Sequence, residues 1–390
     1  MDYNKSIGGY VLTKSEISDL LPKKFKKRHE FLLYLYDILV DILEKNYKFK
    51  LSNLSFEYFE NDNNVNDMET ILRKQKNLDI LEKIYMPHIF FSILQDLCFF
   101  LRESLSCIER GKVTVAFSLA RKPIQDNLFY LTWLLVDSKD FLEKMLFGKP
   151  KDYDVSLLKG NKDLVIKLFS EATEIIRKDN INFADIIFEP EVFYDLVYNR
   201  KAKNSLTSVF DTSIHLVTRN PNYPTESENL NFIFSTNKIW DDFWNLYYEK
   251  IPYILLYLLR VSLSIFEKYI NIESEITEFN RYIINSKMLF AICNATDEEF
   301  YDLFDLVLSS INITCDKCGT SYQLDNNTKK DLREDYLFTC VNCGRTERLG
   351  QYFVDDEYLK SSRRILIDNS NSSFWKIIED YSDSTKINKR

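Results

Sequence analysis

Four cysteines near the C-terminus are the residues in this chain whose spacing most clearly predicts chemistry. They form two CxxC pairs, Cys315 with Cys318 and Cys340 with Cys343. A two-residue spacer lets both sulfurs of a pair reach one ion, so the two pairs can supply four thiolates to a tetrahedral Zn²⁺. Gly319 and Gly344 follow the pairs and allow the left-handed backbone that folds each turn back under the metal. Because all four ligands are cysteines, no coordination position stays open, and the sequence predicts a structural zinc ion.

The residues around the cysteines predict short strands. Period-2 patterning appears at Ile311 and Ile313, at Tyr322 and Leu324, around Leu337 and over 346–349. Strands of this length beside two CxxC pairs resemble a zinc ribbon, and we expect one at residues 310–350. The gap between Cys318 and Cys340 is slightly longer than the usual window, but loop closure costs rise slowly with length.

The charges of the expected ribbon are balanced. Between Ile313 and Leu349 the chain carries six basic and six acidic residues. A neutral module that also carries four thiolates around a divalent ion attracts phosphate weakly. We therefore favour a structural or protein-contact role, and we keep nucleic-acid binding through the ribbon as an alternative.

The composition favours a mainly α protein. Apolar residues make up 45% of the 390 residues and aromatic residues 15%, which is ample for a large core. Only 8 glycines and 8 prolines leave few turn-forming residues, which argues for long helices. The formal net charge of −8 argues against a polyanion binder by bulk charge.

Helical periodicity predicts a multi-helix bundle followed by the small β module. We expect N-terminal helices in residues 1–60, a helical bundle domain in 61–309, the ribbon in 310–350 and a tail in 351–390. Apolar residues at helical spacing between Phe31 and Leu43 predict one helix. Further helices are expected at 67–84, 87–109, 113–136 with a kink at Pro123, 163–177, 190–199, 204–218, 239–248, 252–269, 277–292 and 297–309. Ser138 and Asp140 can cap another short helix that ends by Gly148.

A second group of residues could carry acid–base chemistry. Arg121 and Gln125 share a face of an apolar helix, so burial of the guanidinium would require partners. His215 and Arg219 are expected one helical turn apart, just before a loop rich in Asn and Pro. A histidine beside a guanidinium keeps a lowered pKa and can act as a base at neutral pH.

These residues resemble part of a known group of proteins. The stretch AFSLARKPIQDNLFYLTWLL and the later Ser213-x-His215 resemble uncharacterised bacterial helical proteins of the abortive-infection type and, more distantly, the HEPN superfamily. The resemblance implies a role in phage defence and, as an alternative function, a metal-independent ribonuclease using His215 with Arg121 or Arg219. HEPN nucleases carry an arginine four to six residues before the histidine on one helix, whereas His215 precedes Arg219 here.

Further features narrow the function. The P-loop, dinucleotide-binding, HExxH and GxSxG motifs are absent from the sequence. No apolar run approaches the roughly 20 residues of a membrane span, and the cysteine usage fits a reducing compartment, so we expect a cytoplasmic protein. Cys98, Cys107 and Cys293 are interpreted as small buried apolar residues, and the basic run Lys23–Arg28 as a helix start. The leading hypothesis is a non-enzymatic interaction or regulatory protein that binds protein partners; its oligomeric state is left open.

Overall fold

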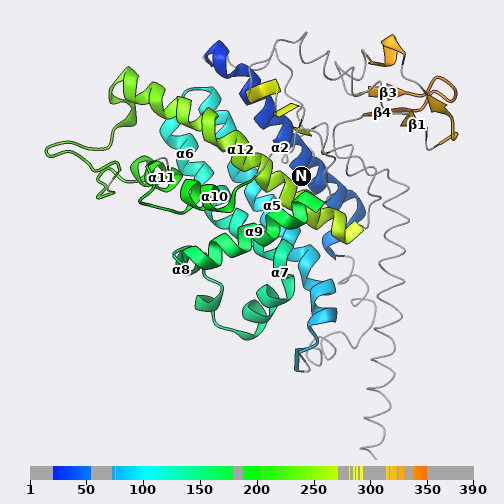
Figure 1. Ribbon diagram of the computed structural model, residues 1–390, viewed down its shortest axis with the longest axis horizontal. Coiled ribbons are helices and arrows are strands. Elements are labelled where there is room, and N and C mark those ends of the chain that lie inside the picture. Colours follow the sequence, from blue (N-terminus) through cyan, green and yellow to red (C-terminus); the bar gives the residue numbers. More distant parts are fainter. Residues whose placement is uncertain are drawn as a thin grey trace, which may run out of the picture.

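The computed structural model of this chain is mainly helical, as predicted (Figure 1). It describes residues 21–53, 73–74, 76–178, 188–203, 205–220, 222–270, 281, 284–285, 287–288, 290–292, 313–315, 317–322, 325–329 and 337–348. The expected helix over 297–309 and the C-terminal tail lie outside these residues, and the division of the chain into domains stays a prediction.

Two long helices organise the body. They are α5 (Leu78–Glu109) and α12 (Asn237–Ile270). Further α-helices in the described residues include α2 (Lys23–Phe49), α6 (Val113–Lys122), α7 (Leu128–Phe147), α8 (Val155–Leu158), α9 (Lys162–Lys178), α10 (Pro190–Val197) and α11 (Leu206–Ile214). α12 contacts α2, α5, α6, α7 and α9, while α5 contacts α2, α6 and α7. One continuous hydrophobic core therefore joins all of these long helices.

In the N-terminal part of the body, the helical periodicity of the sequence correctly predicts which face of α2 is buried. The apolar residues at helical spacing between Phe31 and Leu43 are all buried in α2, as predicted. The basic run at the start of α2 lies partly against α12, where Lys24 donates to the side chain of Asn245 and Arg28 to the carbonyl of Tyr248. α2 ends at Phe49, and the next residue, Lys50, caps it with a left-handed backbone while its N–H bonds to the carbonyl of Asn46.

Two of the predicted breaks at prolines are wrong. Pro87 lies inside α5 and Pro252 lies inside α12, where separate helices were expected. A proline removes one helical hydrogen bond and crowds the preceding turn, at a cost of about 3 kcal/mol. Burial of apolar side chains along two helices of this length outweighs that cost. The same packing accounts for the apolar character of α5, which by length and composition alone could cross a membrane.

Pro123 does end a regular α-helix, as expected. α6 stops at Lys122, and a π-helical segment, Pro123–Asn127, leads into α7. The N–H of Leu128 bonds to the carbonyl of Pro123, five residues earlier. This wider turn rotates the faces of α7 relative to those of α6, because the register of side chains shifts by one residue.

α7 contains a break in its helical backbone, one residue before the position that the sequence predicts. Ser138 and Asp140 were predicted to cap a short helix, but Asp137 has the non-helical backbone, with φ −147° and ψ 78°. Its carboxylate accepts a hydrogen bond from the backbone N–H of Asp140 at 2.9 Å, which is the geometry of an N-cap. The helix ends before Gly148, as predicted.

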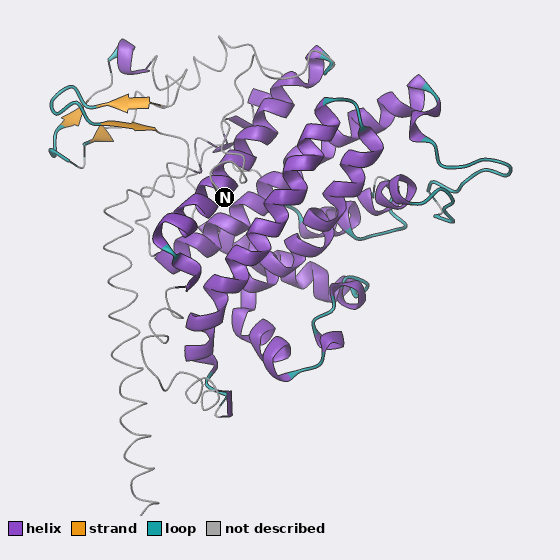
Figure 2. Cartoon of the chain, turned by 180° about the vertical axis from the view of Figure 1, so that it is seen from behind, coloured by secondary structure: helices purple, strands orange, loops and turns teal. Residues whose placement is uncertain are grey.

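The strands lie around the cysteines, at one side of the helical body in two opposite views (Figures 1 and 2). β1 (Ile313–Thr314) pairs with β2 (Ser321–Tyr322), and β3 (Leu337–Thr339) pairs with β4 (Thr346–Arg348). Both pairs are antiparallel. Each hairpin therefore places one CxxC pair in its connecting turn.

Replacing Gly111 with alanine is expected to lower the free energy of unfolding by about 2 kcal/mol. Gly111 joins α5 to α6 with φ +73°, and an added Cβ would lie 2.7 Å from the ring of Trp240. That ring cannot move away freely, because its Nε1 donates to the carbonyl of Gly111 at 2.9 Å. Denaturant unfolding measures the loss. Gly160→Ala is the matched control, because its Cβ meets no atom closer than 3.6 Å; equal losses in both variants would contradict this account.

Candidate metal centre

The four cysteines converge on one point. Their Sγ atoms all lie within 4.8 Å of one another. Two of the separations cross between the two pairs, at 3.7 Å for Cys315 to Cys343 and 3.6 Å for Cys318 to Cys340. The sequence thus identified a real cluster of thiols from two distant turns.

The two turns are built alike. In each, the glycine after the pair donates its N–H to the carbonyl of the first cysteine at 2.8 Å, from Gly319 to Cys315 and from Gly344 to Cys340. The first cysteine in turn donates to a carbonyl beyond the glycine, at 3.0 Å in one turn and 2.7 Å in the other. The glycines have φ of +69° and +68°, and an added Cβ would meet nothing within 4 Å. Backbone conformation, rather than crowding, therefore requires glycine at both positions.

The spacing of the sulfurs fits a tetrahedral ion. Four sulfurs about 2.3 Å from one Zn²⁺ stand about 3.8 Å apart along each edge of a regular tetrahedron. The two cross-pair separations of 3.6 and 3.7 Å agree with that edge. They are far longer than the S–S bond of a disulfide, about 2.05 Å. The donor set therefore suits a metal ion that prefers thiolates.

Two neighbouring side chains, which the sequence alone did not identify, connect the turns. Asn342 of the second turn donates to the hydroxyl oxygen of Thr320 in the first at 3.0 Å. The Thr320 hydroxyl lies 3.2 Å from Sγ of Cys318, and hydrogen bonding by Thr320 lowers the pKa of Cys318 to about 5. Such partners hold metal ligands in position and favour the thiolate form. Cys315 and Cys340 are buried, whereas Cys318 is exposed.

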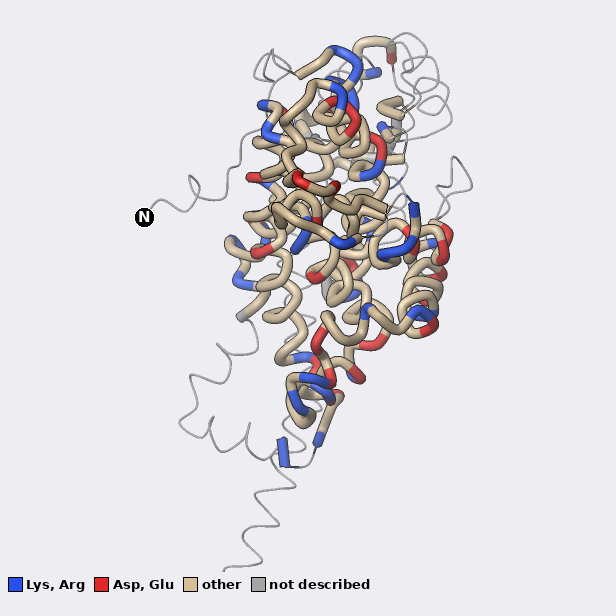
Figure 3. The backbone as a smooth tube through the Cα atoms, turned by 90° about the vertical axis from the view of Figure 1, so that its left-hand side faces the viewer, with Lys and Arg blue, Asp and Glu red and all other residues tan. Residues whose placement is uncertain are grey.

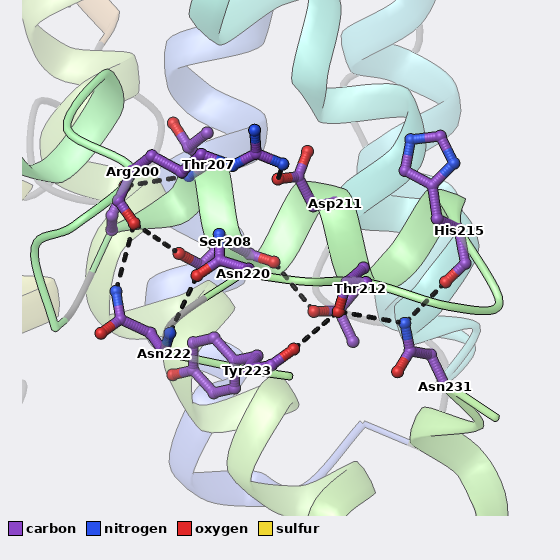
Figure 4. Close-up of polar contacts among 12 residues, drawn as sticks. Arg200, Thr207, Ser208, Asp211, Thr212, His215, Asn220, Asn222, Tyr223 and Asn231 are labelled. Carbon is purple, nitrogen blue, oxygen red and sulfur yellow. Dashed lines mark hydrogen bonds and ion pairs between the residues drawn. The ribbon is translucent and has the colours of Figure 1, made fainter. Parts of the chain in front are cut away.

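The helical spacing predicted for His215 and Arg219 is wrong. α11 ends at Ile214, and His215 has extended backbone with φ −108° and ψ 133°. The side-chain amide of Asn231 donates to the carbonyl of His215 at 2.8 Å and helps to hold this extended course. In Figure 4 the imidazole points away from the polar network that surrounds the backbone. Both His215 and Arg219 are exposed.

Arg121 is also placed differently from the expectation. It is exposed at the end of α6, whereas Gln125 is buried and donates to the carbonyl of Val197 and the hydroxyl of Thr207. The π-helical segment separates their directions. Arg121 lies near Lys159, whose pKa is lowered by burial; Asp126 opposes this shift and Arg121 adds to it. No hydrogen bond or ion pair in the described part of the chain joins Arg121 to His215 or Arg219, and their catalytic role stays a prediction.

The other histidines are placed as structural or surface residues. His29 is completely buried between helices, with Nδ1 3.1 Å from the hydroxyl of Tyr248 and Nε2 3.8 Å from a carboxylate oxygen of Glu109. Because solvent does not reach this ring, it links α2, α12 and α5 rather than forming an accessible site. His88 is exposed on α5.

No protein-family model matches the chain, and neither the curated proteins nor the solved structures contain a match. The resemblance to abortive-infection and HEPN-type proteins, with the roles in phage defence and RNA cleavage that it implies, therefore rests on the quoted residues alone. The arrangement that the structure supports directly is a cluster of four cysteine thiols able to hold a metal ion.

Proposed function

We propose that the four-cysteine module, residues 313–348, binds one Zn²⁺ through Cys315, Cys318, Cys340 and Cys343. The observation that carries the proposal is the cross-pair sulfur spacing of 3.6 and 3.7 Å in two turns of the same design. The ion supplies a cross-link between the two hairpins, and the four thiolates leave no position for water or substrate. The module is then a zinc ribbon with a structural metal. A site of four reduced thiols also suits a reducing compartment such as the cytoplasm.

We further propose that the zinc-bound module contacts another protein. Val341 stands in the second turn between Cys340 and Asn342, with 76% of its surface exposed. An apolar side chain held at the tip of a rigid turn is suited to a pocket on a protein partner. Basic and acidic residues are interspersed along the helical body in the view of Figure 3, which supports protein binding over binding to a polyanion. Nucleic-acid binding through the ribbon would instead show affinity that falls steeply with salt.

The metal content of the purified chain tests the proposed site. We expect one zinc ion per chain by elemental analysis after purification under reducing conditions, and the same stoichiometry from the mass of the native protein. Cys107→Ala is a matched control, because Cys107 is buried in the helical core, far along the chain from the module. Reduced, folded protein that takes up no zinc from an equimolar zinc salt would contradict the proposal.

A further inference from the structure

A cleft lies between α7, α8 and α9, where α9 packs on α7 (Figure 1). Its volume is about 270 Å³, close to the lower end of the range for small-molecule sites, which is about 300 Å³. Most of its lining is apolar, and the residues of that part are Phe129, Trp133, Val136, Leu158, Leu164 and Leu168. A cleft of this size and lining admits the apolar part of one small organic molecule.

The aromatic side of the cleft is held in place by its neighbours. Trp133 and Phe129 are both buried, and their rings meet edge-on with centroids 6.1 Å apart. A second edge-on contact joins Trp133 to Phe141, with centroids 5.2 Å apart. The Nε1 of Trp133 donates to a carboxylate oxygen of Asp140 at 3.0 Å. The indole is therefore fixed before any ligand enters, which lowers the entropic cost of binding.

The cleft already binds one ammonium group, which the chain itself supplies. The Nζ of Lys144 lies 2.6 Å from a carboxylate oxygen of Asp140 and 4.8 Å from the centroid of the Trp133 ring. Both contacts favour a positive charge, because the ion pair and the attraction between a cation and an aromatic ring act together. The lining of the cleft therefore has the chemistry that binds amines.

The carboxylate of Asp137 forms no ion pair within the described part of the chain. The charged lining residues are three acidic and two basic ones, Asp137, Asp140, Glu171, Lys144 and Lys167. Both lysines are paired, one with Asp140 at 2.6 Å and the other with Glu171 at 3.9 Å. Lys139, two residues from Asp137 in sequence, pairs with Asp79. The lining thus carries an excess of one negative charge, at Asp137.

The break in α7 adds negative potential at the same place. The first half of α7 ends at Val136, because the backbone of Asp137 is not helical. The Asp137 Oδ1 accepts the N–H of Asp140 at 2.9 Å, which a continuous helix would direct to the carbonyl of Val136. The carbonyl end of a helix carries a partial negative charge, and Val136 and Asp137 both line the cleft. The cleft therefore favours a cation, which can reach Oδ2 of Asp137.

We propose that this cleft binds a small organic amine in its ammonium form. The ammonium group pairs with the carboxylate of Asp137, and the apolar body of the ligand lies against Trp133 and Leu168. An anion of the same shape is repelled by the excess of acidic groups, and a neutral analogue leaves Asp137 unpaired. The proposal is independent of the zinc site, because no residue of the cleft belongs to the four-cysteine module.

Titration of the full-length, reduced chain with 2-phenylethylamine at neutral pH, followed by tryptophan fluorescence, tests the proposal. Trp133 lines the cleft, so a bound amine changes its emission. We expect saturable binding of one molecule per chain. The affinity should be about fivefold higher than for 2-phenylethanol, which has a similar shape without the charge, because Asp137 is exposed and exposed ion pairs contribute little more than this. Saturable binding of neither this amine nor hexylamine, or equal affinity for the amine and the alcohol, would overturn the proposal.

Asp137→Asn tests the role of the carboxylate, because asparagine caps a helix as well as aspartate does and removes only the charge. We expect about fivefold weaker binding of 2-phenylethylamine and unchanged binding of 2-phenylethanol. Glu143→Gln is the matched control, because Glu143 is exposed on α7 outside the lining and should leave both affinities unchanged. Leu164→Lys places a competing ammonium at an exposed position of the lining and serves as a second test if the first variant does not fold. A folded Asp137→Asn or Leu164→Lys that binds the amine as tightly as the wild type would refute the assignment.

Discussion

Cys340→Ser is expected to abolish stoichiometric zinc binding and to unfold the four-cysteine module. Cys340 is buried, and its sulfur lies 3.6 Å from that of Cys318, so serine removes one of four converging ligands. Structural zinc supplies on the order of 10–16 kcal/mol to the folding of small zinc domains, and strands of two or three residues have little other support. The measurements are zinc content and the rate of limited proteolysis within residues 313–348.

The helical signal is the internal control for Cys340→Ser. The core that joins α2, α5, α6, α7, α9 and α12 contains none of the four clustered cysteines. We therefore expect the far-ultraviolet circular dichroism of the variant to stay close to that of the wild type. Loss of most of the helical signal would mean that the module is a component of the main core, contrary to this account.

Phe117→Ala is expected to lower the free energy of unfolding by about 3–5 kcal/mol, the usual cost of deleting a buried aromatic ring. Phe117 is completely buried where α6 meets α11 and α12. Its ring contacts those of Phe210, Phe243 and Tyr247 edge-on, with centroids 6.3, 6.2 and 5.3 Å away. Alanine would leave a cavity between three helices, and urea unfolding monitored by circular dichroism measures the cost.

Val115→Ala is the matched control for this substitution. Val115 lies on the same helix but is 47% exposed, so its replacement should change stability by no more than about 0.5 kcal/mol. A Phe117→Ala variant as stable as Val115→Ala would show that the aromatic cluster does not hold α6, α11 and α12 together.

The features that the sequence predicts best are local ones. Each CxxC pair with its glycine specifies one tight turn within five residues, so both turns could be recognised without knowledge of the rest of the chain. The burial of Phe31 to Leu43 in α2 follows from the period of the helix in the same way. In both cases, the residues that determine the structure are neighbours in sequence.

The predictions were wrong where contacts between residues far apart in the sequence, or an irregular backbone, determine the structure. Pro87 and Pro252 lie within helices because α5 and α12 pack against the rest of the body. The expectation that proline ends a helix considers only the neighbouring residues and leaves out the free energy of this packing. Arg121 and Gln125 were assigned to one face on the assumption of a regular helix, but the π-helical segment at Pro123 separates them. His215 lies outside α11 in extended backbone, and its carbonyl accepts a hydrogen bond from Asn231, which lies 16 residues further along the chain.

Part of the candidate metal centre was also beyond sequence reasoning. Thr320 and Asn342 lie in different turns, and their bond at 3.0 Å exists only once the two hairpins have come together. Their positions within two residues of a cysteine are the only signal in the sequence, and polar residues are common in such turns. The ligands themselves were predictable, whereas the side chains that hold them were not.

X-ray absorption spectroscopy at the zinc edge of the purified, full-length chain tests the central claim most directly. We predict a first shell of four sulfur atoms at about 2.3 Å from a single zinc ion. A first shell containing nitrogen or oxygen, or three sulfurs with a water molecule, would contradict the closed four-cysteine site.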